Sequence, residues 1–188
     1  MGSGADPVSF DEEGLLAGVR FVASPNADER PGGELPSLIV IHGISLPPRE
    51  FGSDAVERLF TNRLDCASHP YYAALAGLSV STHLFVRRSG EVIQFVPCFR
   101  RAWHAGVSSW RGRERCNDYS VGIELEGADE LPYLEAQYQQ TVRLIAALRH
   151  RYPIDDIVGH ADISPGRKSD PGPAFDWTYL RARLAARR

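Results

Sequence analysis

Two histidines and one aspartate stand where they could hold a metal ion. His42 and His160 each close a short apolar run, and Asp170 opens an Asp-Pro-Gly-Pro segment that its two prolines stiffen. A zinc ion held by two imidazoles and one carboxylate keeps its fourth position open for water, as catalytic zinc sites do. The two histidines are distant in the chain, however, and a histidine that ends a strand is more often a structural residue.

Glu124 is the candidate general base. Within residues 120–126 polar and apolar side chains alternate, so that Gly122, Glu124 and Glu126 share one face of a strand. A carboxylate on a covered face is costly unless it is paired, which favours a position in a cleft. There Glu124 would act as the base toward a metal-bound water, with Glu126 as its rival for that role. The alternative is an edge strand whose acidic face meets solvent.

Lys168 is the only lysine among 21 basic residues. Lysine is a compact point charge, and a single lysine kept in so arginine-rich a chain is a candidate for a specific task. It precedes Asp170 by two residues, so it would reach the same cleft and stabilise a negatively charged oxygen there. Chance composition is the alternative explanation.

A long segment without a clear period, residues 101–115, suggests a functional loop. It contains Trp103 and His104, an aromatic ring and an imidazole that could contact a sugar or a peptide. The arginines between positions 111 and 115 could bind an anion, although a run of charges is usually only a solvated surface. His83, which opens a strand, is expected in the core or behind the site.

The segments that must position these residues predict a mixed β-sheet flanked by helices. Apolar runs predict strands over residues 37–42, 83–87, 92–96, 120–126 and 157–160. Helical spacing and end signals predict helices over residues 54–60 and 135–151 and from Asp176 onward. We therefore expect an α/β fold of the α+β type, with the zinc site on the cleft face of the sheet near the strand ends.

The length and composition describe one ordinary globular domain. The chain has 188 residues, of which 43% are hydrophobic and 24% charged, and its net charge is −3. This balance excludes a disordered or collagen-like chain, and no apolar run approaches the ~18 residues of a membrane span. We expect a monomer with a single domain over residues 1–188 and a flexible N-terminal segment, residues 1–13. The charge predicts neither a nucleic-acid nor a membrane partner.

The cysteines and the N-terminus point to a reducing compartment. Cys66, Cys98 and Cys116 are odd in number and form no CxxC pair, which is not the pattern of a disulfide-stapled secreted domain. The first residues carry neither the charged nor the apolar region of a signal peptide. A cytoplasmic location is the resulting expectation.

Four stretches of the chain together resemble one enzyme family. They start at residues 40, 101, 112 and 159 and read VIHGISLPPREFG, RAWHAGVS, GRERCNDYSVGIELEG and GHADISPGRKSDPGPAFDW. In combination they are similar to the cytoplasmic 1,6-anhydro-N-acetylmuramoyl-L-alanine amidases of Gram-negative bacteria, over nearly the whole chain. Those enzymes belong to a zinc amidase superfamily that includes amidase-type phage lysozymes and peptidoglycan recognition proteins.

The resemblance implies a role for each candidate residue. The zinc ligands fall on His42, His160 and Asp170, the acid/base glutamate on Glu124, and an oxyanion-stabilising lysine on Lys168. The implied reaction hydrolyses the amide between anhydro-N-acetylmuramic acid and L-alanine of the stem peptide, with water on one Zn²⁺ per chain as nucleophile. This would free the peptide for cell-wall recycling and, in some bacteria, remove the muropeptides that induce β-lactamase.

The resemblance also bears on substrate binding. Arg115 matches an arginine that is expected to hold a carboxylate of the stem peptide, and Trp103 and His104 are further candidates for substrate contact. Two positions depart from the family pattern. Gly43 follows the first ligand where Asn is common, and Ser79 stands where a basic residue is expected, which predicts altered order beside the ligand and an altered peptide preference.

Two other functions fit the same fold. A peptidoglycan recognition protein without zinc would only bind muropeptides, and an exported amidase would act on intact sacculi. The complete ligand set argues against the first, and the missing export signal together with the full-length resemblance argues against the second. The expected substrate is a small anhydromuropeptide.

Overall fold

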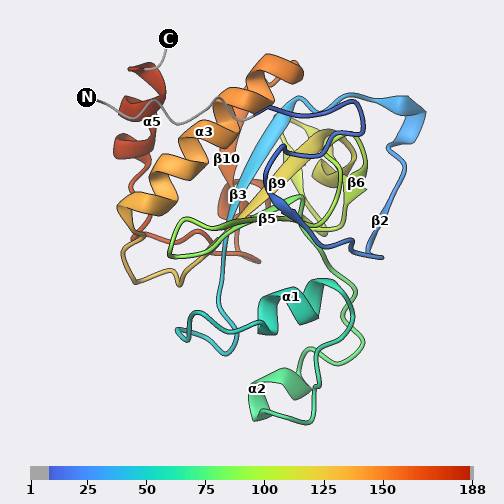
Figure 1. The fold of residues 1–188 in the computed structure, drawn as a ribbon, viewed down its shortest axis with the longest axis vertical. Helices are drawn as coiled ribbons and strands as arrows, with labels where there is room; N and C mark the ends of the chain where they lie inside the picture. Colours follow the sequence, from blue (N-terminus) through green and yellow to red (C-terminus); the bar gives the residue numbers. More distant parts are fainter. Residues whose placement is uncertain (1–8, 187–188) are drawn as a thin grey trace.

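One six-stranded mixed sheet forms the centre of the computed structural model, which describes residues 9–186 (Figure 1). The strand order is β1-β5-β4-β9-β3-β10; β4 and β5 pair antiparallel, and the other neighbours pair parallel. The strands are β1 (Arg20–Phe21), β3 (Leu38–Ile44), β4 (Leu84–Val86), β5 (Val92–Gln94), β9 (Ser120–Glu126) and β10 (Asp156–Gly159). The predicted α+β class is confirmed. Positions 1–8 of the N-terminal segment expected to be flexible lie outside the described residues.

Within residues 9–186, two short strand pairs and five α-helices complete the fold. The pairs are β2 (Ala27–Asp28) with β6 (Arg101–Ala102) and β7 (Ser109–Trp110) with β8 (Arg113–Glu114). The helices are α1 (Ala55–Phe60), α2 (Pro70–Ala73), α3 (Glu135–Arg151), α4 (His160–Ile163) and α5 (Trp177–Ala185), with 3-10 turns η1 (Pro31–Gly33) and η2 (Cys116–Tyr119). The predicted long helix therefore has the bounds that its pattern indicated.

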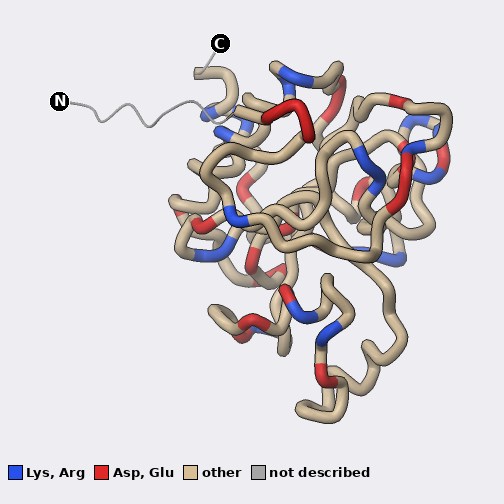
Figure 2. Tube along the Cα trace, turned by 45° about the vertical axis from the view of Figure 1, so that its right-hand side comes forward, with Lys and Arg blue, Asp and Glu red and all other residues tan. Residues whose placement is uncertain are grey.

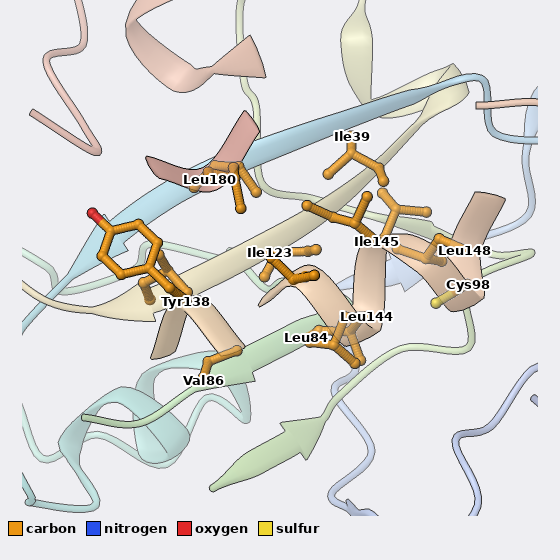
Figure 3. Close-up of a cluster of buried hydrophobic side chains, with 14 of the residues drawn as sticks. Ile39, Leu84, Val86, Cys98, Ile123, Tyr138, Leu144, Ile145, Leu148 and Leu180 are labelled. Atoms are coloured by element: carbon orange, nitrogen blue, oxygen red, sulfur yellow. The ribbon is translucent and has the colours of Figure 1, made fainter. Parts of the chain in front are cut away.

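One face of the sheet packs against α3 and α5. Ile39, Leu84 and Ile123 on this face meet Ile145 and other apolar residues of α3, and Leu180 of α5 joins the same cluster (Figure 3). Because side chains alternate across a strand, the residues between these apolar positions point to the opposite face. That second face carries the polar residues of β3 and β9.

A long excursion, residues 45–83, leaves the sheet between β3 and β4 and carries α1 and α2 away from the main body (Figure 1). Leu59 and Phe60 of α1 are buried against Phe85 and Phe95, so the excursion has its own apolar cluster on the second face. The short helix α2, which the sequence pattern did not predict, starts with Pro70, and the imidazole of His69 accepts a hydrogen bond from its backbone.

Three predicted boundaries near the site are wrong. His42, expected to close its strand, lies inside β3, which continues to Ile44. The segment 101–115, expected to be a loop, contains β6, β7 and β8, because strands of two residues carry no readable period. His160, expected to close a strand, is the first residue of α4. The chain turns directly after Gly159, whose N–H donates to the Asp162 carboxylate at 2.7 Å, so the helix begins where the strand ends.

The described residues include no long apolar helix, and their charged residues are of both signs. No helix within residues 9–186 combines the length and the apolar character needed to cross a bilayer. Basic and acidic residues are interspersed along the chain (Figure 2). All three cysteines are free thiols, and Cys98 and Cys116 are buried.

Arg30 ties the N-terminal arm to the sheet. Its guanidinium is buried, with only 4% of the residue exposed, and burial lowers its pKa to about 10. It donates hydrogen bonds of 2.8–3.1 Å to the backbone carbonyls of Cys98, Phe99, Asn117, Asp118 and Ser120. The planar five-donor guanidinium is suited to such a ring of acceptors, whereas an ammonium group offers only three donors from one point.

We expect Arg30→Lys to lower the free energy of unfolding by roughly 3 kcal/mol. A hydrogen bond to a charged group contributes about 1.5–3 kcal/mol, and the ammonium leaves at least one buried carbonyl unpaired. Urea denaturation measures the change. The matched control is Arg58→Lys at an exposed ion pair with Asp54, where a change within ~0.5 kcal/mol is expected. Equal effects at the two positions would contradict the role given to Arg30.

Candidate metal centre and active site

The three predicted metal ligands lie together at one edge of the sheet. Nδ1 of His42 is 3.0 Å from Nδ1 of His160, and Oδ2 of Asp170 is 3.2 Å from the first nitrogen and 3.1 Å from the second. All the candidate ligand atoms lie within 4.8 Å of one another. Residues far apart in the sequence thus form one cluster.

Strand register explains this convergence. β3 and β10 are parallel neighbours in which Gly159 pairs with Ile41, so His160, the next residue, emerges beside His42. The chain after α4 then turns back, and the N–H of Ala161 donates to the carbonyl of Asp170 at 2.9 Å. The carboxylate is therefore brought to the two imidazoles by backbone bonding.

The donor atoms of this cluster fit a cation. Nε2 of His160 is 3.1 Å from the carbonyl oxygen of Ala105, so this nitrogen carries the proton of the neutral ring and Nδ1 presents a lone pair. Burial lowers the pKa of His42 to about 4, which keeps its ring neutral as well. Burial opposes ionisation of Asp170, but the adjacent imidazoles outweigh burial and lower its pKa below the usual range. Neutral imidazoles and an ionised carboxylate are the forms in which these side chains bind zinc.

Glu124 lies beside this cluster. It pairs with His42 in the register of β9 and β3, and its Oε1 is 3.9 Å from Nδ1 of His42. Its other carboxylate oxygen is buried without a hydrogen-bond partner among the described residues. Burial raises the pKa of Glu124 well above its usual range, and the charge of Asp170 adds to the rise. Because β9 lies between β4 and β3, the alternative of an edge strand is wrong.

Glu126, the rival base, is occupied elsewhere. Its carboxylate accepts hydrogen bonds from the N–H of Gly52 at 2.6 Å and of Arg88 at 3.0 Å. It does not line the cavity in which Glu124 lies. These contacts hold two loops against the strand, so the geometry favours Glu124 as the base.

A cavity of about 630 Å³ opens over the cluster. Its floor includes Glu124, His160 and Asp170, and the exposed side chain of Lys168 stands at its wall. Apolar side chains of the excursion form a second wall together with Trp103; they are Leu46, Leu59, Phe60, Leu75, Leu78 and Val80. The uncharged Ser79 also lines this wall, at the position where the family pattern predicts a basic residue.

The predicted substrate-binding residues occupy three different settings. Trp103 is half-buried and lines the cavity. His104 also lies at the cavity, but its ring is buried and both ring nitrogens have protein partners. Arg115 is exposed outside it, in an adjoining cavity of about 510 Å³, and its Nε is 3.1 Å from the Asp118 carboxylate. The two cavities share Gly106 and Arg167, so a long ligand could extend from one into the other.

Tyr133 is a site residue that the sequence analysis did not identify. Its hydroxyl donates to the carbonyl of Pro171, next to the ligand Asp170, at 3.0 Å. A Cβ atom added at Gly43 would lie 2.2 Å from that hydroxyl oxygen. The tyrosine therefore fills the space that a side chain after His42 would take. A glycine beside a predicted ligand was the only signal in the sequence.

Comparisons with known proteins assign the chain to a family. Residues 32–173 match the family model described as N-acetylmuramoyl-L-alanine amidase (Amidase_2). The 1,6-anhydro-N-acetylmuramyl-L-alanine amidase AmpD of Citrobacter freundii is 56% identical over 173 residues, which are 91% of this chain and 92% of that protein.

Two solved structures extend the comparison. The crystal structure of a selenomethionine AmpD derivative, 55% identical, superimposes with a TM-score of 0.91 over 93% of this chain and 98% of its own. The Escherichia coli amidase AmiD, in complex with anhydro-N-acetylmuramic acid-L-Ala-D-γ-Glu-L-Lys, is 31% identical with a TM-score of 0.58, over 93% of this chain and 65% of its own.

We expect Gly43→Ala to destabilise the protein by about 1–3 kcal/mol, because the added methyl group collides with the Tyr133 hydroxyl. In a Tyr133→Phe background the same substitution should cost much less, since the next nearest atoms lie at 3.5 Å. Thermal denaturation of the two single variants and the double variant measures this coupling. If the stability change of the double variant equals the sum of the two single changes, the methyl group and the Tyr133 hydroxyl do not occupy the same space.

Proposed function

The chain belongs to the N-acetylmuramoyl-L-alanine amidase family, and we propose that it hydrolyses the amide between 1,6-anhydro-N-acetylmuramic acid and L-alanine of the stem peptide. The named activity of relatives more than half identical over most of both chains supports this choice. The substrate in the related AmiD complex contains the same anhydro sugar and begins its peptide with L-alanine.

The observation that carries the proposal is the convergence of His42, His160 and Asp170 beside the unpartnered carboxylate of Glu124. One candidate ligand atom from each of the two imidazoles and the carboxylate lies within 4.8 Å of the others, and this donor set fits Zn²⁺ better than it fits the hard cations, which take oxygen ligands. We assign these three residues as the zinc ligands. A zinc ion at this position supplies Lewis-acid polarisation of a carbonyl and lowers the pKa of water that it binds.

Two side chains of the protein then handle the proton and the charge. Burial raises the pKa of Glu124 above its usual range, which favours proton uptake, so this carboxylate takes a proton from the attacking water and delivers it to the departing alanine nitrogen. The ammonium of Lys168 stabilises the negative charge that develops on the carbonyl oxygen. Both groups line the same cavity as His160 and Asp170, which supports their joint action on one amide.

The cavity also supports a substrate with an apolar and a charged part. The wall from the excursion and Trp103 provides the apolar surface on which a sugar ring packs. The stem peptide would run toward the adjoining cavity, where Arg115 stands to meet a carboxylate. Ser79 lines the wall that residues 45–83 form, where the family pattern has a basic residue. We therefore expect this wall to bind a carboxylate of the stem peptide more weakly than a wall with a basic side chain would.

The cellular role that follows is peptidoglycan recycling in the cytoplasm. Cleavage would release free stem peptide and anhydro-N-acetylmuramic acid from muropeptides. Where such muropeptides signal β-lactamase induction, the same reaction would lower the signal.

Incubation with anhydromuramyl-tripeptide tests the proposal, with products identified by mass spectrometry. We expect free tripeptide and anhydro-N-acetylmuramic acid, loss of both products after chelation, and their return on addition of Zn²⁺. If the zinc-loaded protein binds the muropeptide without cleaving it, the chain is a recognition module. If it cleaves only intact sacculi, the assigned substrate is wrong.

We expect Glu124→Gln to keep zinc bound while turnover falls by at least ~10²-fold, the lower range for general acid–base catalysis, because an amide cannot accept the proton. The metal content and kcat of the purified variant measure the two effects. Glu126→Gln is the matched control on the same strand face, and it should retain most of its turnover because that carboxylate lies outside the cavity. A near-normal rate for the Glu124 variant would refute the assignment.

A further inference from the structure

His104 lies directly behind His42, on the side away from the candidate metal site. His42 points Nδ1 toward His160 and Asp170, while its Nε2 is 2.9 Å from Nδ1 of His104. The other ring nitrogen of His104, Nε2, is 3.1 Å from the hydroxyl oxygen of Ser120. The two imidazole planes cross at 90° with their centroids 5.0 Å apart. A continuous row of hydrogen bonds therefore runs from His42 through His104 to Ser120.

The proton positions in this row depend on one another. When Nδ1 of His42 binds a metal ion, the proton of the neutral ring sits on Nε2 and must be donated. The atom that faces it is Nδ1 of His104, which accepts only if the His104 proton is on Nε2. That proton is in turn donated to the Ser120 hydroxyl oxygen. The row can also run in the opposite direction, because the Ser120 hydroxyl can donate. Only the arrangement in which His104 accepts from His42 and donates to Ser120 leaves a lone pair on Nδ1 of His42 for a metal.

The two candidate histidine ligands differ in this respect. Nε2 of His160 faces the carbonyl oxygen of Ala105, an acceptor that cannot become a donor. His42 faces an imidazole, which either accepts or donates at the same atom. Whether Nδ1 of His42 carries a lone pair for a metal therefore depends on the proton position in His104, whereas His160 depends only on a backbone carbonyl.

The surroundings of His104 hold its ring in this place. A Cβ atom on Gly122 would lie 2.6 Å from Cγ of the ring, so only glycine at that position leaves room for it. The ring of His83 packs against its other side at 5.6 Å between centroids. The backbone N–H of His104 donates to the side-chain oxygen of Asn117 at 3.1 Å. Ser120, Gly122 and Glu124 share one face of β9, which thus supplies the hydroxyl, the space and the candidate base.

We propose that His104 and Ser120 are positioning residues that fix His42 in the tautomer whose Nδ1 binds zinc. The inference rests on the proposed zinc amidase function, but zinc binding can be measured without substrate. It replaces the predicted contact of His104 with a sugar or peptide, because both of its ring nitrogens are already used by protein groups.

Zinc affinity of two His104 variants is the main test, measured by competition with a chromophoric chelator. His104→Leu removes the acceptor and should weaken zinc binding by about 10–100-fold, the usual effect of losing such a partner of a metal-ligating histidine. His104→Asn places an amide oxygen near the position of Nδ1 and should keep most of the affinity. Equal affinities of both variants and the wild type would overturn the proposal.

Ser120→Ala provides a second variant that changes the shape of the core very little. It leaves the Nε2–H of His104 without its acceptor, so zinc affinity should fall by several-fold even if the leucine variant does not fold. Thr141→Val is the matched control, because it removes a buried hydroxyl from α3, on the other side of the sheet. The same affinity in the Ser120 and Thr141 variants would count against the row of hydrogen bonds.

A nuclear magnetic resonance measurement on the zinc-loaded wild type reports the tautomers directly. Long-range ¹H–¹⁵N spectra of histidine-labelled protein should show a protonated Nε2 and an unprotonated Nδ1 on His104. A protonated Nδ1 would overturn the proposal. So would variants that raise KM for anhydromuramyl-tripeptide at unchanged zinc affinity, since that result identifies a substrate contact. A wild type that binds no zinc rejects the proposed function together with the inference.

Discussion

The parallel pairing of β3 with both β9 and β10 is the constraint on which the rest of the molecule depends. This pairing puts the carboxyl ends of three neighbouring strands at one edge, where His42, Glu124 and His160 emerge within reach of one another. A shift of one residue in either pairing would turn these polar side chains into the apolar layer under α3. The same alternation that fills the core with isoleucine, leucine and valine therefore also fixes the geometry of the site.

Burying so many polar groups on one face of a sheet is costly unless each has a partner. The second face meets this requirement with side chains from distant segments. Arg30 supplies donors to carbonyls behind β9, Ser120 and His104 support His42, and Glu126 receives two backbone N–H groups. Only Glu124 keeps a buried oxygen without a partner among these site residues, which marks it as the group left free for chemistry.

Local sequence patterns predict much of this arrangement. The spacing of apolar residues predicts α3 and the long strands, and the positions of His42 and His160 after short apolar runs, together with Asp170, predict the ligand cluster. The choice between Glu124 and Glu126 could not be read locally, because the two carboxylates are two residues apart and share one face of β9. It depends on loops that reach Glu126 from positions 52 and 88.

The roles of His104, Arg30 and Tyr133 escaped sequence analysis for the same physical reason. Each acts on a partner far away in the chain, so neither spacing nor residue type shows the contact. His104 has the residue type of a ligand or a substrate contact, and only the positions of Ser120 and Gly122 around its ring distinguish a supporting role. The Tyr133 hydroxyl fills the space beside Gly43, and this contact cannot be read from the sequence around either residue alone.

Anomalous diffraction from crystals of the zinc-loaded protein tests the central claim most directly. The account predicts one zinc peak per chain at the point shared by Nδ1 of His42, Nδ1 of His160 and the Asp170 carboxylate, with Glu124 outside the ligand set. Coordination through Nε2 of either histidine, a peak at the cysteines, or Glu124 in place of Asp170 would contradict it.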